Sequence, residues 1–180
     1  MPAIARSFFI QSCLLVAVAA AGPVLANVDN AALPGPVQVP AGHAMKLWSV
    51  GKGEIRYACR ERADQAGGYA WAFVAPMATL YDKDMKAIGK YYGGPTWEAA
   101  DGSKVTGKQL AVAPGSAGSI PLQLVQAEPA MGQGAMTGVS YIQRLNTQGG
   151  VPPSAPCDAS RAGAEQTVSY QADYVFYGAK

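Results

Sequence analysis

Four side chains in two separate stretches are the best candidates for binding a ligand. Trp97 and Glu98 are neighbours, while Arg144 and Asn146 belong to the most polar run of the chain. An arginine fork binds a carboxylate or a phosphate through parallel hydrogen bonds, and an indole ring offers a flat apolar platform. We therefore predict a site for a small molecule or a glycan, provided that the fold brings the two stretches together. The alternative is structural: Arg144 pairs with an acid and Asn146 caps the turn that follows.

Glu98 and Asp101 suggest a second kind of chemistry. Two carboxylates beside an aromatic ring are what a glycosidase uses, one as an acid and the other as a base or nucleophile. The sequence Asp101-Gly102 also predicts a tight turn, in which the aspartate has a purely structural role. A glycan-acting hydrolase is therefore an alternative hypothesis, which the separation and the pKa values of the two carboxyl groups decide.

His43 is the only histidine of the chain, and Met45 follows two positions later. An imidazole and a thioether form a weak, soft pair for copper, to which Met131 and Met136 could add sulfur ligands. A single histidine excludes most zinc sites, which need three protein ligands. The simpler interpretation is a loop histidine before the first strand, so we expect no resident metal or cofactor.

The first 26 residues have the features of an export signal. Arg6 provides a positive start, residues 8–21 are mostly apolar, and Val24-Leu25-Ala26 offers small residues for cleavage. We predict cleavage after Ala26 and an exported protein, periplasmic or extracellular. Because the apolar run is shorter than the roughly 20 residues of a membrane span, we expect no membrane anchor after cleavage.

Cysteine usage agrees with export. Cys13 leaves with the signal, so Cys59 and Cys157 remain in the mature chain. An even pair in an oxidising compartment predicts a disulfide. Two free thiols, one of them catalytic, are the alternative, but neither cysteine has a histidine nearby in the sequence.

Charge and length limit the partners and the number of domains. The formal net charge is +2, and loss of Arg6 lowers it to +1. Basic and acidic residues are not clustered, so nucleic acid and anionic membranes are not expected partners. Residues 27–42 contain three prolines and predict an extended lead-in, and residues 43–180 predict one β domain with its own core. The oligomeric state has no signature in the sequence.

Apolar and polar residues alternate in many short runs, which predicts an all-β protein. We expect an antiparallel β-sandwich or barrel of about nine or ten short strands, with little helix outside the signal peptide. Gly51-Lys52-Gly53 and residues 100–103 predict turns. In the last strand, one face carries apolar side chains at alternate positions: Val168, Tyr170, Ala172, Tyr174 and Phe176. In the strand before it, Ile142, Arg144 and Asn146 face away from Val139, Tyr141, Gln143 and Leu145.

Several blocks of the sequence also carry a family resemblance. The most specific are Gly94-Pro-Thr-Trp-Glu98 and Tyr141-Ile-Gln-Arg-Leu-Asn-Thr147; the others are residues 39–43, 57–59, 69–76, 79–82, 101–103, 149–150 and 157–158. Together they resemble the domain of unknown function 3455, a family of exported bacterial and fungal proteins. The resemblance implies that the cysteine pair, the 94–103 turn and the 141–158 stretch belong to one common architecture. It implies no catalytic residue, because the family has no established activity. Tyr91-Tyr92 stands where the family resemblance leads us to expect His-Tyr, which leaves no second histidine ligand.

These observations favour a binding or envelope-associated module over an enzyme. No stretch of the sequence carries a complete catalytic motif, and the strongest polar group, around Arg144, is suited to holding an anion. We therefore take a non-catalytic binding protein as the leading hypothesis, with the hydrolase and the copper protein as alternatives.

Overall fold

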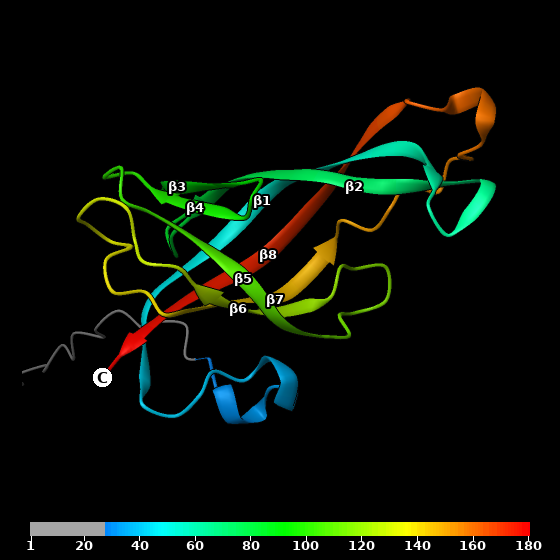
Figure 1. Cartoon of the computed structure of the whole chain (residues 1–180). Helices are drawn as coiled ribbons and strands as arrows, with labels where there is room; N and C mark the ends of the chain where they lie inside the picture. The colour runs from blue at the N-terminus through cyan, green and yellow to red at the C-terminus, as the bar shows by residue number, and fades with distance from the viewer. Residues whose placement is uncertain (1–27) are drawn as a thin grey trace, which may run out of the picture.

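The structure is a closed antiparallel β-barrel, seen in a computed structural model that describes residues 28–180 (Figure 1). Each strand pairs with the next in the chain, and the last strand returns to pair with the first. The all-β prediction is confirmed, and the open choice between sandwich and barrel is decided in favour of the barrel. The strands are β1 (His43–Arg62), β2 (Gln65–Tyr81), β3 (Ala87–Tyr92), β4 (Thr96–Ala99), β5 (Lys104–Ala113), β6 (Leu122–Ala127), β7 (Tyr141–Gly149) and β8 (Glu165–Ala179).

The number and length of the strands differ from the prediction. Residues 28–180 form eight strands rather than nine or ten, and β1 alone has 20 residues. The turn expected at Gly51-Lys52-Gly53 does not form, because β1 runs straight through it, paired on both sides. A Cβ at Gly51 would lie 2.5 Å from the Tyr174 ring, and one at Gly53 would lie 2.0 Å from the Met77 carbonyl. These glycines allow neighbours to approach the strand closely, rather than ending it.

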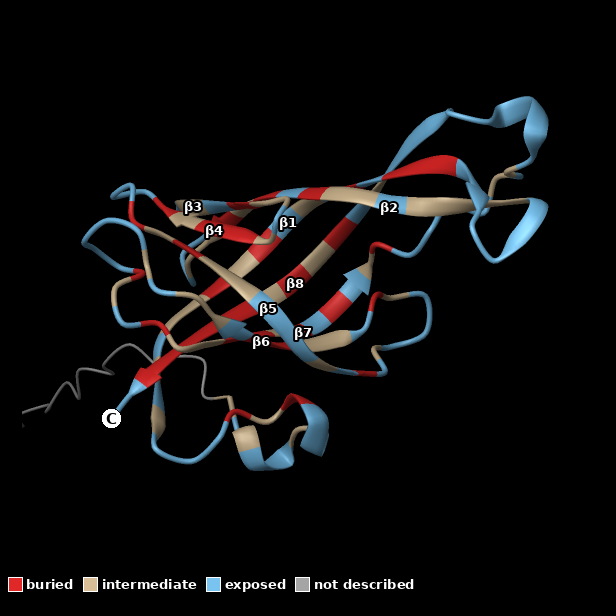
Figure 2. Ribbon diagram, in the orientation of Figure 1, coloured by how far each residue is buried: buried red, intermediate tan, exposed pale blue. Residues whose placement is uncertain are grey.

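The barrel interior is filled by aromatic and branched side chains. The predicted inward face of β8, from Val168 to Phe176, packs there as expected, in a stripe of buried positions along the strand (Figure 2). At its centre Tyr91 stacks on Trp97 with ring centroids 4.9 Å apart, and Tyr174 lies 4.9 Å from Tyr91. Bulky rings of this kind fill a small barrel, and Gly51 of β1 leaves space for the Tyr174 ring.

A second, smaller core lies outside the barrel, beneath the lead-in. Residues 28–42 make two single 3-10 turns, η1 (Asn30–Ala32) and η2 (Gly35–Val37), and cross the outer face of the sheet (Figure 1). Val37 is fully buried there with Val39, Leu145 and Val175. The lead-in is thus packed against the domain and hides one outer face of the sheet. Besides these turns, the described residues hold only one more helical segment, η3 (Ala159–Arg161).

An arm of the structure extends past one end of the barrel. It consists of the end of β1, the start of β2, the start of β8 and the loop that leads into β8 (Figure 1). In this arm a disulfide joins Cys59 of β1 to Cys157 of the loop, with Cα atoms 5.6 Å apart, as the sequence predicts. The predicted signal peptide, residues 1–26, lies outside the described residues. Within residues 28–180, no helix has the length and apolar character needed to cross a membrane.

Candidate functional site

The four candidate ligand-binding residues do not share one pocket. Trp97 is buried inside the barrel, with 1% of its surface exposed. Glu98, the next residue of β4, forms ion pairs with lysines that are more than a third exposed. Arg144 lines a pocket at one end of the barrel, and Asn146 lines a different pocket beneath the lead-in. Successive residues of a strand point to opposite faces, so Trp97 and Glu98 cannot contact the same ligand.

A local irregularity in β7 places Arg144 and Asn146 on opposite faces of the sheet. Residues two apart in a regular strand share a face, but the β7–β8 register shifts between Leu145 and Gln148. Asn146 takes a left-handed backbone conformation with φ of 47°. Its side-chain amide donates to the Asp173 carboxylate over 2.7 Å, outside the barrel. The prediction that Arg144 and Asn146 lie on the same face therefore fails at this bulge.

The carboxylates of Glu98 and Asp101 are both held by other groups. Glu98 accepts a 2.7 Å hydrogen bond from the Tyr92 hydroxyl and contacts the ammonium groups of Lys90 and Lys104, at 3.2 and 3.6 Å. The bond from Tyr92, followed by the contact with Lys90, lowers the pKa of Glu98. A glycosidase needs one carboxyl group whose pKa is raised so that it stays protonated. Glu98 does not have that environment.

Asp101 is likewise structural in its contacts. It accepts hydrogen bonds from the Ser103 hydroxyl at 2.6 Å and from the backbone N–H of Ala135 at 2.8 Å, and these bonds lower its pKa. The Asp101-Gly102 turn between β4 and β5 forms as predicted, with Gly102 at φ of 86°. Since the pKa of both carboxyl groups is lowered, the pair offers no general acid.

The candidate copper pair is also engaged in other contacts. The Nδ1 atom of His43 lies 3.1 Å from the Pro40 carbonyl, and its ring meets Tyr141 edge-on at 4.8 Å. Met45 packs against the outer core beneath the lead-in. Over residues 28–180, His, Cys, Asp and Glu side chains form no group of three or more that could hold a metal ion.

The clearest candidate site is the mouth of the barrel, at the end that carries the arm. Here a pocket of about 510 Å³ opens between strand ends and loops. Its walls are mostly apolar or aromatic, and Phe73 at the rim is 57% exposed. We call this pocket the barrel mouth; its lining is Ile55, Tyr57, Phe73, Pro76, Tyr91, Gly94, Pro95, Gln109, Ile120, Pro121, Gln123 and Arg144. Its volume lies within the range of pockets that hold small molecules.

Arg144 is the only charged side chain among the residues that line the barrel mouth. Its Nε and Nη2 atoms donate to the Pro121 carbonyl, at 3.2 and 2.9 Å, which fixes one edge of the guanidinium. Among the described residues, the ion pairs all involve other side chains, so Arg144 has no acidic partner. The structural alternative in which Arg144 pairs with an acid is therefore not realised.

Four buried tyrosines lie near enough to Arg144 to feel its charge, and two of them, Tyr57 and Tyr91, line the mouth. Burial raises the pKa values of Tyr57, Tyr91, Tyr170 and Tyr174, and the charge of Arg144 acts on all four in the opposite direction. The Tyr57 hydroxyl donates to the Gly150 carbonyl at 2.7 Å, and the hydroxyls of Tyr170 and Tyr174 lie 3.2 Å apart. Burial outweighs the effect of Arg144, so these phenols stay neutral at ordinary pH.

The two most specific sequence blocks do meet, through the predicted Arg144 and through two residues that were not predicted. Gly94 and Pro95 of the first block and Arg144 of the second line the same pocket. The side chains of this pocket that the sequence analysis did not predict include Tyr57, Phe73 and Tyr91. The sequence did carry one signal for a site inside the barrel. Arg144 follows Ile142 by two positions in a strand, so it shares the inward face of that core residue.

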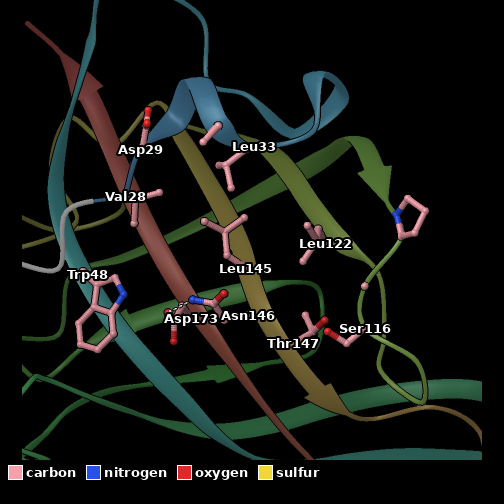
Figure 3. Close-up of a pocket in the computed structure, with 13 residues that line it drawn as sticks. Val28, Asp29, Leu33, Trp48, Ser116, Leu122, Leu145, Asn146, Thr147 and Asp173 are labelled. Carbon is pink, nitrogen blue, oxygen red and sulfur yellow. Dashed lines mark hydrogen bonds between the residues drawn. The ribbon is translucent and has the colours of Figure 1, made fainter.

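A second pocket, of about 640 Å³, lies outside the barrel between the lead-in and the sheet (Figure 3). Leu33, Leu122 and Leu145 form its apolar side, and Asn146 bonds to Asp173 on its polar side (Figure 3). Burial raises the pKa of Asp173, and no basic side chain is among the residues that line this pocket. We call it the outer groove. The charged side chains of the outer groove are acidic, whereas that of the barrel mouth is basic, so the two pockets suit ligands of different charge.

The fold and the barrel mouth define a β-barrel protein with a ligand-sized pocket at one end. The chain belongs to the DUF3455 family, described as a protein of unknown function, whose sequence profile matches residues 40–178. This confirms the resemblance seen in the sequence. Comparisons with curated proteins and with solved structures give no match to the chain.

Proposed function

We propose that this protein is an exported, non-catalytic binding module that holds a small, largely apolar molecule in the barrel mouth. The observation that carries the proposal is an open pocket of about 510 Å³ with mostly apolar and aromatic walls and a single charged anchor, Arg144. Binding pockets for small molecules generally combine an apolar lining with a few placed polar groups. The disulfide in the arm and the predicted signal peptide support a periplasmic or extracellular location.

The lining of the barrel mouth favours binding over catalysis. It contains no Asp, Glu, His, Cys, Ser or Lys. The tyrosines among its residues have raised pKa values, which makes them poor bases at neutral pH. A hydrolase at Glu98 and Asp101 would need a different environment for at least one of these carboxyl groups.

A neutral fluorescent dye tests the proposal without assuming a charge on the ligand. N-phenyl-1-naphthylamine emits strongly when it enters an apolar pocket, so its fluorescence reports binding. Gln123 lines the mouth from β6, and Gln123→Trp places a large ring in the opening. We expect this variant to bind the dye at least tenfold more weakly than the wild type.

Gln126→Trp is the matched control, because Gln126 is an exposed residue of the same strand that does not line the mouth. It should bind the dye as the wild type does. The proposal is wrong if the wild type gives no saturable dye fluorescence. It is also wrong if Gln123→Trp and Gln126→Trp have the same affinity while both keep the melting temperature of the wild type.

A further inference from the structure

We infer that the ligand of the barrel mouth carries a single carboxylate, which is held by the free edge of the Arg144 guanidinium. This inference rests on the proposed function, because it names the head group of a molecule bound in that pocket. The argument has three steps: the donors that Arg144 has available, the charge around it, and the shape of the space in front of it.

The first step concerns hydrogen-bond donors. A guanidinium has five N–H groups in one plane. In Arg144, the N–H group of Nε and one N–H group of Nη2 donate to the Pro121 carbonyl. Both N–H groups of Nη1 and the second one of Nη2 remain without a partner within residues 28–180. The adjacent pair on Nη1 and Nη2 forms the end-on edge, which matches the two oxygens of a carboxylate. The bond to Pro121 holds that edge in place before a ligand arrives.

The second step concerns charge. Arg144 lies in a mostly apolar pocket with no acidic side chain in its lining. Arg144 is only half-buried, so water still reaches its charge. A ligand that covers this cation without supplying a counter-ion removes that water at a cost, and an anionic head group offsets the cost. The nearby phenols do not supply the anion, because burial keeps Tyr57 and Tyr91 neutral. The Tyr57 hydroxyl is also already committed to the Gly150 carbonyl.

The number of charges distinguishes a carboxylate from a phosphate. Arg144 is the only cation that lines the pocket, and no second basic side chain is available to balance another negative charge. A phosphate monoester carries between one and two negative charges at neutral pH and has three acceptor oxygens to satisfy. A carboxylate has one charge and two oxygens in a plane, which one guanidinium edge can satisfy.

The third step concerns the body of the ligand. Most of the walls around Arg144 are apolar or aromatic, formed by Ile55, Phe73, Pro76, Pro95 and Ile120. The two glutamines of the lining bond to each other, with the Gln123 amide donating to the Gln109 carbonyl oxygen. The apolar side chains favour a ring system or a short branched chain attached to the carboxylate. Aromatic or alicyclic carboxylic acids therefore fit the pocket better than sugars, whose hydroxyl groups would find few partners there.

The test compares molecules that differ only in the head group. By isothermal titration calorimetry, we expect the wild type to bind 2-naphthoate at least tenfold more tightly than the neutral 2-naphthamide, a difference of about 1.4 kcal/mol. It should also bind 2-naphthoate more tightly than 2-naphthyl phosphate. Arg144→Gln should remove the preference for 2-naphthoate and still bind N-phenyl-1-naphthylamine, while Arg144→Lys should keep part of the preference.

Arg56→Gln is the control, because Arg56 pairs with Glu165 instead of lining the mouth, and it should keep the full preference. Equal affinity of the wild type for 2-naphthoate and 2-naphthamide would overturn the inference, and so would a preference for 2-naphthyl phosphate. In either case continued dye binding would leave the proposed function standing. Absence of dye binding in the wild type would instead contradict the proposed function itself. The wild-type comparison needs no variant, so it decides the question even if Arg144→Gln fails to fold.

Discussion

At the scale of single residues, neighbours on β7 have opposite roles because they face opposite sides of the barrel wall. Arg144 points to the barrel mouth and keeps part of its donor capacity free. Gln143 is fully buried beneath the lead-in, where its amide donates to the Val37 carbonyl at 2.6 Å and accepts from the Tyr177 hydroxyl at 2.9 Å. These hydrogen bonds occupy the Gln143 amide and hold the lead-in against the sheet, whereas Arg144 keeps free donors for a ligand.

Asp173 in the outer groove gives a prediction about pH at this scale. Burial raises its pKa, and its hydrogen bond from Asn146 only partly opposes that shift. A carboxyl group whose pKa is higher in the folded than in the unfolded state stabilises the fold at low pH, and that contribution is lost as the pH rises from the ordinary value through the folded one. Asp173→Asn, which cannot ionise, should therefore raise the free energy of unfolding at pH 7.

Urea unfolding of the wild type and Asp173→Asn between pH 3 and pH 7 measures this effect. The gap between the two proteins should be largest at neutral pH and should shrink as the pH approaches the ordinary carboxyl pKa. Asp29→Asn is a control, since Asp29 lines the same groove but is exposed. If Asp173→Asn were less stable than the wild type at pH 7, the prediction would be wrong, because the Asp173 charge would then be stabilised by its surroundings.

At the scale of elements, β1 determines how closely the barrel walls pack. Gly51 lies against the Tyr174 ring and Gly53 against the backbone of β2 at Met77 and Ala78. Larger residues would push these neighbours away, and the backbone of a paired strand has little freedom to move. β1 therefore needs one small residue beside the Tyr174 ring and another beside the backbone of β2.

Gly53→Ala tests the role of β1. We expect it to lower the free energy of unfolding by about 1–3 kcal/mol, the usual effect of overpacking a well-packed site. Gly35→Ala is a matched control, because a Cβ there meets nothing within 4 Å and the backbone angle is ordinary. It should change stability by less than about 0.5 kcal/mol. Equal stabilities of the two variants in urea unfolding would refute the packing explanation.

Some elements could be predicted from the sequence and others could not. The alternation of β8 gave its inward face correctly, because every second residue from Val168 to Phe176 is apolar. Gly51 and Gly53 led to the wrong prediction of a turn, because glycine suits a turn and a close contact between strands equally well. Only the neighbouring strands, which lie far away in the sequence, distinguish the two roles. Trp97 and Glu98 were assigned to one site because their side chains suit a ligand, although adjacent residues of a strand face opposite sides of the sheet. Barrel closure depends on pairing of β1 with β8, which are far apart in the chain and carry no local signal of each other.

At the scale of the whole molecule, the disulfide ties the arm together beside the barrel mouth. It spans 98 positions, and in the same loop the Trp71 indole donates to the Ala155 carbonyl at 2.8 Å. Tyr57, which lines the mouth, donates to Gly150 at the start of that loop. The cross-link therefore restricts a segment that borders the pocket.

Reduction of the disulfide should lower the stability of the protein. For a loop of about 100 residues, a chain-entropy treatment puts the loss at up to ~4–5 kcal/mol. Intact mass should rise by two hydrogens on reduction, and urea unfolding should shift to lower concentration. The double variant Cys59→Ser/Cys157→Ser should not respond to the reductant. Free thiols at Cys59 and Cys157 in the native protein would contradict the pairing.

The central claim is that ligands bind in the barrel mouth at Arg144, and a ¹H–¹⁵N NMR spectrum tests it most directly. The three indole N–H groups report on different places: Trp48 lines the outer groove, Trp71 bonds to Ala155 in the arm, and Trp97 stacks on Tyr91 beneath the mouth. Addition of 2-naphthoate should shift the signals of Trp97 and of the Arg144 Nε–H group and leave Trp48 unchanged. A shift of Trp48 with Trp97 and Arg144 unchanged, or no shift of any of these signals, would contradict the claim.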